Sequence, residues 1–322
     1  MPFFSTMTEN EHLVDERMGG WRVEKICAQL YPGRTRPQWQ NLIEAGGVLV
    51  NGRRARRGDR PEAGATLRLL SLPPEADAWT PAFTDPGALR VVLQTASVVL
   101  ADKPPGLPTL PLTPEDAPTA AGALFAAFPG IVGDPPREAG IVNRLDNDTA
   151  GLLVAGLTPP VQERLRQRFA SHRIEKTYRA LVHGRFPEGP RWLSGRVFTL
   201  GTSRVRYEPG EGDGGQMAIS LATRVWEGGG YSLVDVVTRF GRRHQVRVQL
   251  AAEGHPIVHD GLYGPGAALG IPGHFLWARQ VTFADPESEL PRTVESRFLP
   301  RPWLELAAAL GCVGHFGGVE AF

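Results

Sequence analysis

The sequence predicts a small α/β unit followed by a larger domain that combines strands and helices. Two bulk properties and one pattern lead to this prediction. The 322 residues suffice for one large domain and a small one. Glycine (38 residues) and proline (29 residues) are abundant, which favours a turn-rich, β-containing fold. Along the chain, short apolar runs typical of strands alternate with segments of helical periodicity.

The first 72 residues divide into a tail and a compact unit. Residues 1–20 are polar and rich in acidic side chains, and we predict a mobile tail there. In residues 21–72, two segments of helical periodicity precede the apolar run Val48–Val50, the tight turn Asn51-Gly52 and a returning strand at Ala65–Leu70. We therefore expect two helices and a strand pair in this unit.

This unit also concentrates positive charge. Residues 21–70 hold ten basic and four acidic residues, whereas the whole chain has a formal net charge of +1. Such an excess suggests a polyanion as partner, although a solvated surface is the plainer alternative. The arginines that we expect to contact phosphate are Arg36, Arg53, Arg54, Arg56 and Arg57.

A linker and a strand-rich segment follow. Residues 73–90 contain several prolines among scattered polar residues, which is the composition of a linker. From Val91 onward the pattern changes to strands, at Val91–Leu93 and Val98–Leu100. The proline-rich segment Asp102–Pro108 then predicts a rigid turn, in which Lys103 is the residue able to do more than shape the turn.

The stretch Ile141–Val154 places a polar centre between two apolar runs. The runs predict short buried strands, and Asn147-Asp148 with Gly151 predicts the turn between them. Arg144 and Asp146 would then lie at a strand end, where a scaffold can present a carboxylate to a cleft. Judged by the residues alone, Asp146 could equally be a turn residue that bonds its own backbone, and for Asp148 we favour that role.

The segment Asn143–Leu153 resembles the central motif of the RluA-type pseudouridine synthases. That motif usually reads His-Arg-Leu-Asp, two variable residues, then Thr-Ser-Gly-Leu. The Arg-Leu-Asp core and the threonine and glycine positions are kept, whereas Asn143 replaces the usual histidine and Ala150 the usual serine. The resemblance implies that Asp146 is the catalytic carboxylate.

Three further segments resemble motifs of the same family, in the same order. Lys103–Leu107 is similar to the motif Lys-Pro-x-Gly-Leu, which is thought to support the catalytic loop. The alternating segment Glu175–Val182 is similar to a Lys-x-Tyr segment whose tyrosine contacts the target base. This implies that role for Tyr178, which without the resemblance would be a core residue. Gly241–Leu250 resembles Gly-Arg-x-His-Gln-Ile-Arg-Val-His-Leu, with Gln249 in place of the last histidine. The family's active-site arginine then corresponds to Arg247.

Residues 21–72 resemble the α-L RNA-binding domain, which often precedes the catalytic domain in this family. The Val-Asn-Gly turn is the more specific part of that match. The resemblance therefore implies an α+β protein. A catalytic domain at residues 91–310, with a mixed and mainly antiparallel sheet, would follow the small RNA-binding domain, and residues 311–322 would form a second tail.

The reaction implied by the resemblance is the isomerisation of specific uridines in structured RNA to pseudouridine. Large-subunit ribosomal RNA is the favoured substrate and transfer RNA the alternative. Uracil is detached, turned and rejoined through carbon 5, so one ionised carboxylate suffices as nucleophile or base, and neither metal nor other cofactor is expected. Arg247 would hold Asp146 ionised, and Tyr178 would stack on the flipped base. The other residues of this domain that we expect to contact RNA are Lys103, Arg144, Arg242, Arg243 and His244.

The residues also allow two other functions. A non-catalytic RNA-binding or ribosome-assembly protein could keep the fold, and the replacements at Asn143, Ala150 and Gln249 are its support. A hydrolase could use Asp146 and Asp148 as a carboxylate pair, but turn carboxylates two residues apart usually diverge.

Other classes of protein fit the sequence less well. Cys27 and Cys312 lie far apart, which argues against a disulfide framework and a cysteine zinc site. His255, His259 and Asp260 do not have helical metal-ligand geometry, because Pro256 interrupts the segment. No apolar run reaches the length of a membrane span, and the N-terminus lacks the pattern of a signal peptide. We therefore expect a cytoplasmic monomer with no membrane partner.

Overall fold

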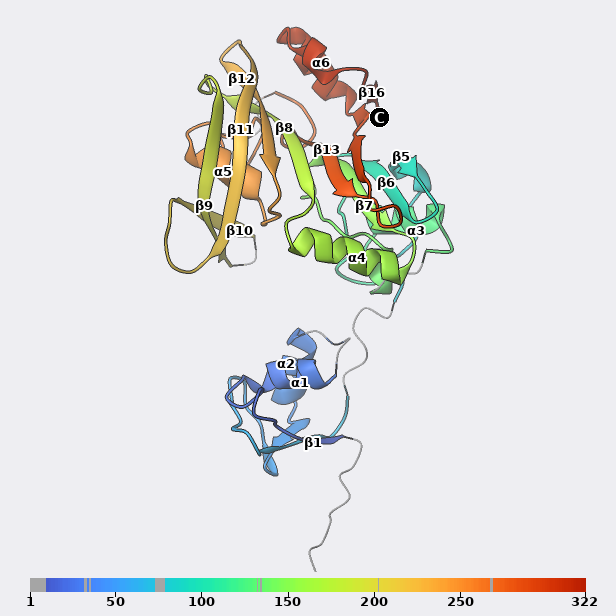
Figure 1. Cartoon of the computed structure of the whole chain (residues 1–322), viewed down its shortest axis with the longest axis vertical. Helices are drawn as coiled ribbons and strands as arrows, with labels where there is room; N and C mark the ends of the chain where they lie inside the picture. Colours follow the sequence, from blue (N-terminus) through green and yellow to red (C-terminus); the bar gives the residue numbers. More distant parts are fainter. Residues whose placement is uncertain are drawn as a thin grey trace, which may run out of the picture. The chain divides into compact units, whose positions relative to one another are not determined.

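The computed structural model describes residues 10–31, 34, 36–72, 79–131, 133, 135–201, 203–266 and 269–322, with only the backbone of residues 36 and 37. The chain forms two compact units, Met1–Trp79 and Thr80–Phe322 (Figure 1). The boundary falls inside the segment predicted as a linker. Within that segment, Thr84 and Leu89 are buried and belong to the second unit. No helix among the described residues is long and apolar enough to span a membrane.

The N-terminal unit is a four-stranded antiparallel sheet with two helices, in the strand order β1-β4-β2-β3. Asn51 and Gly52 both adopt left-handed backbone conformations, with φ of 49° and 76°, as a two-residue hairpin turn requires. Trp39 and Ile26 are fully buried at the centre of its core. The elements are β1 (Glu11–Leu13), α1 (Val23–Leu30), α2 (Arg36–Glu44), β2 (Val48–Val50), β3 (Arg53–Arg54) and β4 (Thr66–Leu69).

The described part of the predicted N-terminal tail differs from the prediction. Residues 11–13 form β1, which pairs with β4, and Val14 and Met18 are buried in the core of the unit. The acidic composition had suggested a mobile tail. Asp15 instead closes a turn, in which its carboxylate accepts a hydrogen bond of 2.8 Å from the Met18 N–H. Residues 1–9 lie outside the described part of the chain.

The larger unit is built on one ten-stranded sheet, with β14 attached to β13 and the other strands in the order β10-β9-β11-β12-β8-β13-β7-β6-β5. All of its pairs are antiparallel except β13 with β7, which confirms the predicted mixed and mainly antiparallel sheet. The strands are β5 (Arg90–Gln94), β6 (Val98–Lys103), β7 (Ala150–Gly156), β8 (Glu175–His183), β9 (Pro190–Leu200), β10 (Arg204–Pro209), β11 (Gln216–Gly228), β12 (Tyr231–Thr238), β13 (Leu276–Ala284) and β14 (Pro291–Glu295). The helices are α3 (Ala120–Ala127), α4 (Pro159–Ala170), α5 (Gln245–Ala252) and α6 (Arg301–Ala309).

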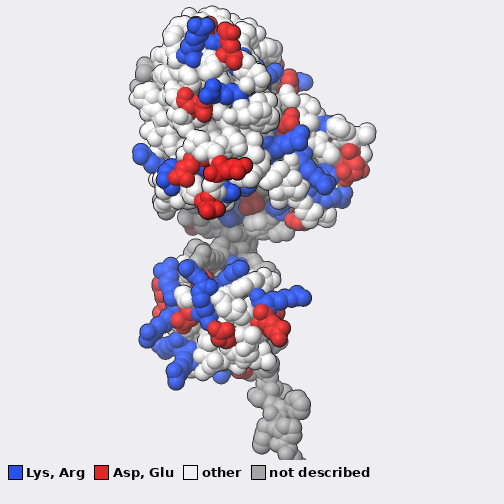
Figure 2. Space-filling view, turned by 60° about the vertical axis from the view of Figure 1, so that its left-hand side comes forward, with Lys and Arg blue, Asp and Glu red and all other residues white. Residues whose placement is uncertain are grey.

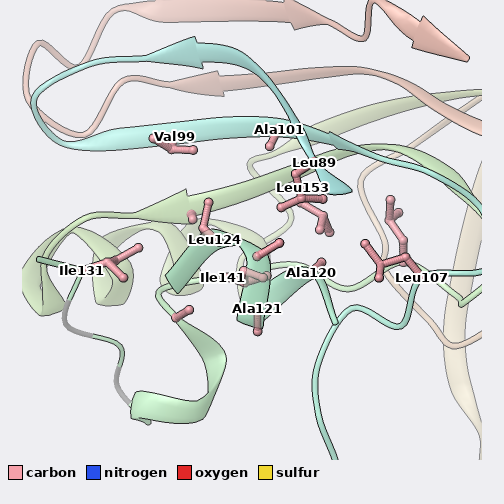
Figure 3. Packing of buried hydrophobic residues seen from close by; sticks show 14 of the residues in the cluster. Leu89, Val99, Ala101, Leu107, Ala120, Ala121, Leu124, Ile131, Ile141 and Leu153 are labelled. Atoms are coloured by element: carbon pink, nitrogen blue, oxygen red, sulfur yellow. The ribbon is translucent and has the colours of Figure 1, made fainter. Parts of the chain in front are cut away.

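Helices cover both faces of this sheet. On one face, α3 packs on β6 and β7 through Leu124 and Leu153, as Figure 3 shows, and α5 packs on β8 and β12 through Leu250. On the other face lie α4 and α6. Side chains alternate between the faces along each strand, so Tyr178 on β8 points to the face of α3 and α5 and contacts both of their clusters. That face carries the functional site.

The close pairing of β7 with β13 depends on Gly151. Its φ is +113°, and a Cβ atom at this position would lie 2.3 Å from the Ala278 carbonyl oxygen. Only glycine permits this approach. Because Ala150 and Gly151 come directly after the polar stretch at residues 143–149, the parallel pair fixes where that stretch joins the sheet.

The C-terminal region also differs from the prediction. Residues 276–284 form one bulged strand, β13, which pairs with β7, β8 and β14. The predicted tail is ordered: Phe316 is buried against Trp277, and β16 (Glu320–Ala321) pairs with β15 (Phe298–Leu299). One buried aromatic side chain anchors this glycine-rich segment, and a composition-based prediction misses such an anchor.

Candidate active site

Asp146 lies in an irregular loop between Ile141 and β7. The strand predicted at Ile141-Val142 is reduced to a single bridge from Ile141 to Ala155. The loop is held from inside by Thr109, whose hydroxyl donates to the Leu145 carbonyl at 2.7 Å and accepts from the Leu145 N–H at 3.2 Å. The buried Leu145 leaves the neighbouring Asp146 side chain 27% exposed. The loop therefore presents this carboxylate to solvent from a fixed backbone.

Lys103 is hydrogen-bonded to the same loop. Its ammonium donates hydrogen bonds of 2.8–2.9 Å to the carbonyl oxygens of Pro104, Leu107 and Asn147. Burial lowers the pKa of Lys103 to about 7, although the charges of two nearby aspartates oppose this shift. The side chain is fully buried, so the prediction that Lys103 contacts RNA is wrong. Its three carbonyl partners instead join the segment 103–107 to the loop of Asp146.

Arg247 on α5 holds the Asp146 carboxylate. Its Nη1 donates to Asp146 Oδ2 at 2.8 Å, while Nε and Nη2 donate to the two oxygens of Asp260 at 2.7 and 2.8 Å. Asp260 is fully buried, and its Oδ1 also accepts from the backbone N–H groups of Leu262 and Tyr263. This two-point contact fixes the guanidinium plane, so that one N–H is aimed at Asp146.

The charges of Arg247 and of the two carboxylates that it contacts stabilise one another. Burial would lower the pKa of the Arg247 guanidinium, but hydrogen bonds and the charges of Asp260 and Asp146 raise it above its ordinary value. Burial opposes ionisation of Asp260, yet Arg247 lowers the pKa of that carboxyl. The cation is therefore permanent, and it lies 2.8 Å from the Asp146 carboxylate.

Tyr178 lies near this pair. It is half-buried and pairs across strands with Val236 and Ala278. Burial raises its pKa, and the charge of Asp146 raises it further, so the phenol keeps its proton and lies within electrostatic reach of the carboxylate. The structure thus brings together the three residues predicted as catalytic: Asp146, Tyr178 and Arg247.

Sequence reasoning missed three residues beside this group. Asp260 binds Arg247, the Tyr263 hydroxyl accepts from the Val205 N–H and lies 2.9 Å from His244 Nδ1, and the buried His274 bonds the Thr149 hydroxyl through Nε2 at 2.8 Å. Burial lowers the pKa of His274, so its imidazole is neutral. The sequence gives no indication that the segment Asp260–Gly264 approaches α5.

The other residues predicted to contact RNA differ in exposure. Arg144 and Arg243 are exposed beside the site, Arg242 is half-buried and donates to the Met217 carbonyl, and His244 is mostly buried next to Asp146. In the N-terminal unit, Figure 2 shows basic side chains over much of the visible face. The exposed arginines there include Arg53, Arg54, Arg56 and Arg57, whereas the side chain of Arg36 lies outside the described residues.

Two of the replaced motif residues brace the strand after the loop. The Asn143 side chain accepts from the Val154 N–H at 2.7 Å and donates to the Leu152 carbonyl at 3.2 Å. The Asn143 side chain therefore holds the loop against β7 through two hydrogen bonds. Ala150 is fully buried where β7 pairs with Trp277. Neither residue has a described hydrogen bond or ion pair to Asp146.

The third replaced residue, Gln249, is buried on α5. Its amide donates to the Leu193 carbonyl at 2.9 Å and its oxygen accepts from the Ser220 hydroxyl at 2.7 Å. These contacts tie α5 to β9 and β11. The side chain is thus part of the support for the helix that carries Arg247.

Among the described residues, no cluster of three histidine, cysteine or acidic side chains could hold a metal ion. The arrangement offers one oriented carboxylate, a fixed cation and an aromatic side chain. Such a set can act on a substrate as nucleophile or base while an aromatic ring is stacked beside it.

Comparisons of the sequence and of the fold with known proteins agree on one family. A family model described as RNA pseudouridylate synthase matches residues 97–252, and a model of the S4 domain matches residues 21–67. An uncharacterized RNA pseudouridine synthase of Chloroflexus aurantiacus is 33% identical over 270 residues, which cover 83% of each chain. A ribosomal large subunit pseudouridine synthase D of Pseudomonas aeruginosa is 29% identical over 260 residues, which cover 81% of this chain and 79% of that one. The solved structure of human RNA Pseudouridylate Synthase Domain Containing 1 has the same fold, with a TM-score of 0.54 and 20% identity over 71% of this chain and 96% of that one.

Proposed function

Because the chain belongs to the RluA-type RNA pseudouridine synthases and carries an N-terminal S4 domain, we propose that it modifies specific uridines of large-subunit ribosomal RNA through Asp146. The protein is an isomerase that acts on RNA, as the sequence predicted. The choice of ribosomal RNA is supported by relatives named as synthases of the large ribosomal subunit. The proposal includes a monomeric, cytoplasmic protein; its buried free cysteines suit a reducing compartment.

One observation carries the assignment of Asp146. Its carboxylate is partly exposed and accepts a hydrogen bond of 2.8 Å from Arg247, which Asp260 holds in place. A structural carboxylate would more often be buried with its hydrogen bonds satisfied, as Asp260 is. Asp146 instead keeps one oxygen, Oδ1, facing a histidine at 3.8 Å, beyond hydrogen-bonding distance. This oxygen is available to the substrate.

The proposed mechanism uses these residues as follows. The target uridine is flipped from the RNA at a cost of roughly a few kcal/mol and stacks beside Tyr178. The bond between N1 of uracil and C1′ of ribose breaks, and its electron pair stays on the uracil. The Asp146 carboxylate, oriented by Arg247, either forms an ester bond to C1′ as the uracil leaves or takes a proton from C2′. The base turns and C5 bonds to C1′, while the ester bond breaks or the proton returns to C2′. The hydrogen of C5 then leaves as a proton, and N1 gains one.

The alternative, a non-catalytic RNA-binding protein, is less favoured than the enzyme. It relied on Asn143, Ala150 and Gln249, and all three side chains serve packing or backbone contacts. A carboxylate pair is also disfavoured, because Asp148 is exposed in the turn and packs beside Gly273.

Replacement of Asp146 by asparagine tests the proposal. Asparagine keeps the size and the turn but cannot act as a carboxylate, so the rate should fall on the order of 10⁴-fold or more. The assay is tritium release from RNA labelled at C5 of uridine, with RNA binding followed by filter retention. Binding should persist, because phosphate contacts dominate affinity. Asp148→Asn is the matched control and should remain active; full activity of Asp146→Asn would refute the assignment.

A further inference from the structure

His244 occupies an unusual position at the start of α5. Its backbone is left-handed, with φ of 52° and ψ of 19°, although it is neither glycine nor asparagine. Such conformations cost free energy and concentrate at functional sites, where the surrounding structure holds them. The side chain is 9% exposed and lies in the same cluster as Arg247 and Asp146. The imidazole is therefore held at the site instead of turned into solvent.

A chain of hydrogen bonds favours one nitrogen of this imidazole as the site of the proton. The Val205 N–H on β10 donates to the Tyr263 hydroxyl oxygen at 3.0 Å, and the same oxygen lies 2.9 Å from His244 Nδ1. Burial raises the pKa of Tyr263, so the phenol keeps its one hydrogen. This oxygen could accept a second hydrogen bond, but the phenol hydrogen has no other described acceptor, so we assign that hydrogen to the contact with Nδ1. Nδ1 is then an acceptor, and the proton of a neutral imidazole resides on Nε2.

The Nε2–H group points toward the catalytic carboxylate but is not used by it. Nε2 lies 3.8 Å from Asp146 Oδ1, which is too far for a hydrogen bond, and it makes none to any other described residue. Burial, helped by Arg247 and Arg243, lowers the pKa of His244, although Asp146 opposes the shift. A neutral donor of fixed tautomer thus faces the space beside Asp146.

We propose that His244 Nε2–H donates a hydrogen bond to a carbonyl oxygen of the flipped uracil while that base is detached from ribose. The inference rests on the function proposed above. When the N1–C1′ bond breaks, its electron pair remains on the uracil and increases the negative charge on the carbonyl oxygens. A donor aimed at such an oxygen stabilises the transition state more than the ground state. No proton is transferred: His244 keeps the hydrogen on Nε2 throughout, and Tyr263 is a positioning residue.

Nitrogen NMR on protein with ¹⁵N-labelled histidine tests the tautomer directly. In the full-length protein we expect the His244 signals of a protonated Nε2 and an unprotonated Nδ1 at neutral pH. Tyr263→Phe removes the hydrogen donated to Nδ1, so the Nδ1–H form should become populated. A wild-type imidazole protonated on Nδ1 would overturn the proposal.

Kinetics test the contact with the base. His244→Ala should lower kcat by about 10²- to 10³-fold with a smaller change in KM, because one donor to a developing oxyanion is removed. His244→Gln places an amide N–H near the position of Nε2 and should recover part of that activity. His255→Gln is the matched control, since this histidine lies beyond the end of α5 and bonds the His183 carbonyl.

The outcomes separate this inference from the proposed function. If His244→Ala keeps the wild-type kcat while Asp146→Asn is inactive, the hydrogen bond to the base is refuted and the function stands. If glutamine and alanine at position 244 reduce activity equally and both proteins remain folded, the donor role is refuted. If the wild-type protein forms no pseudouridine, the proposed function itself fails.

Discussion

The arginines of the two units differ in what surrounds them. In the catalytic unit, Arg247 is almost fully buried, and all of its described hydrogen bonds go to two carboxylates of the protein. In the N-terminal unit, Arg53, Arg54 and Arg56 are exposed, with no described ion pair. A buried guanidinium is committed to orienting its partners, because an unpaired charge there is costly. An exposed guanidinium gains by contact with a phosphate. Under the proposed function, arginine would therefore orient the reacting carboxylate in one unit and bind RNA in the other.

Among the changes that test this comparison, Arg247→Met should have the largest effect on turnover and stability. The variant frees Asp146 and leaves the Asp260 carboxylate buried without its cation. Turnover should fall by about 10²-fold or more, and the free energy of unfolding should fall by about 3–5 kcal/mol. Denaturant unfolding and the tritium assay measure the two effects.

A double variant separates the two roles of Arg247. Adding Asp260→Asn removes the buried charge and keeps an oxygen for the N–H groups of Leu262 and Tyr263. Stability should largely recover, but activity should not. Recovery of activity would show that Arg247 serves only to neutralise Asp260.

The next effect concerns RNA affinity. Replacing Arg53, Arg54 and Arg56 by alanine should weaken RNA binding and lower the slope of log affinity against log salt by roughly 0.7–0.9 for each phosphate that the protein no longer neutralises. Binding measured at several salt concentrations gives the slope. Arg57→Ala is the control with a smaller effect, because this guanidinium already donates to Glu44 and Gln40 at 2.8 and 2.7 Å. An unchanged slope in the triple variant would argue against phosphate contacts by these arginines.

The smallest expected effect concerns stability against pH, and it compares two buried carboxylates. Asp102 is fully buried like Asp260 but has no arginine partner: its Oδ2 accepts from the Arg297 and Phe298 N–H groups, and its Oδ1 has no described partner. Burial raises the pKa of Asp102 to about 6, although hydrogen bonding to Ser296, Arg297 and Phe298 opposes the shift. The protonated carboxyl therefore contributes stability that is full below the ordinary value of 3.8 and is lost as pH rises through about 6.

Asp102→Asn tests this pH dependence. Between pH 4 and 7 the wild-type protein should lose roughly 2–3 kcal/mol relative to the variant. Denaturant unfolding of both proteins across this range gives the difference. Parallel stability curves would mean that the carboxyl of Asp102 does not titrate in the folded state within this window.

The parts of the fold and site that could be predicted are those with a local sequence signal. Asp146 and Arg247 lie in contiguous motifs, and the Asn51-Gly52 turn is specified by two residues. The partners of these residues come from distant segments: Asp260 meets Arg247 across 13 residues, and Lys103 meets the loop of Asp146 across 44. Burial of a lysine, or of the aromatic anchor Phe316, depends on tertiary packing that no local pattern encodes.

The burial of Lys103 has a practical consequence for chemical labelling. All three lysines of the chain, Lys25, Lys103 and Lys176, belong to its described part. Lys103 and Lys176 are buried and donate to backbone carbonyls, whereas Lys25 is exposed beside Trp21 in the N-terminal unit. Among side-chain amines, dyes and cross-linkers would therefore modify Lys25 in the N-terminal unit and leave Lys103 and Lys176 of the larger unit unmodified. A fluorescent reporter can in this way be attached without breaking the hydrogen bonds that these two lysines donate.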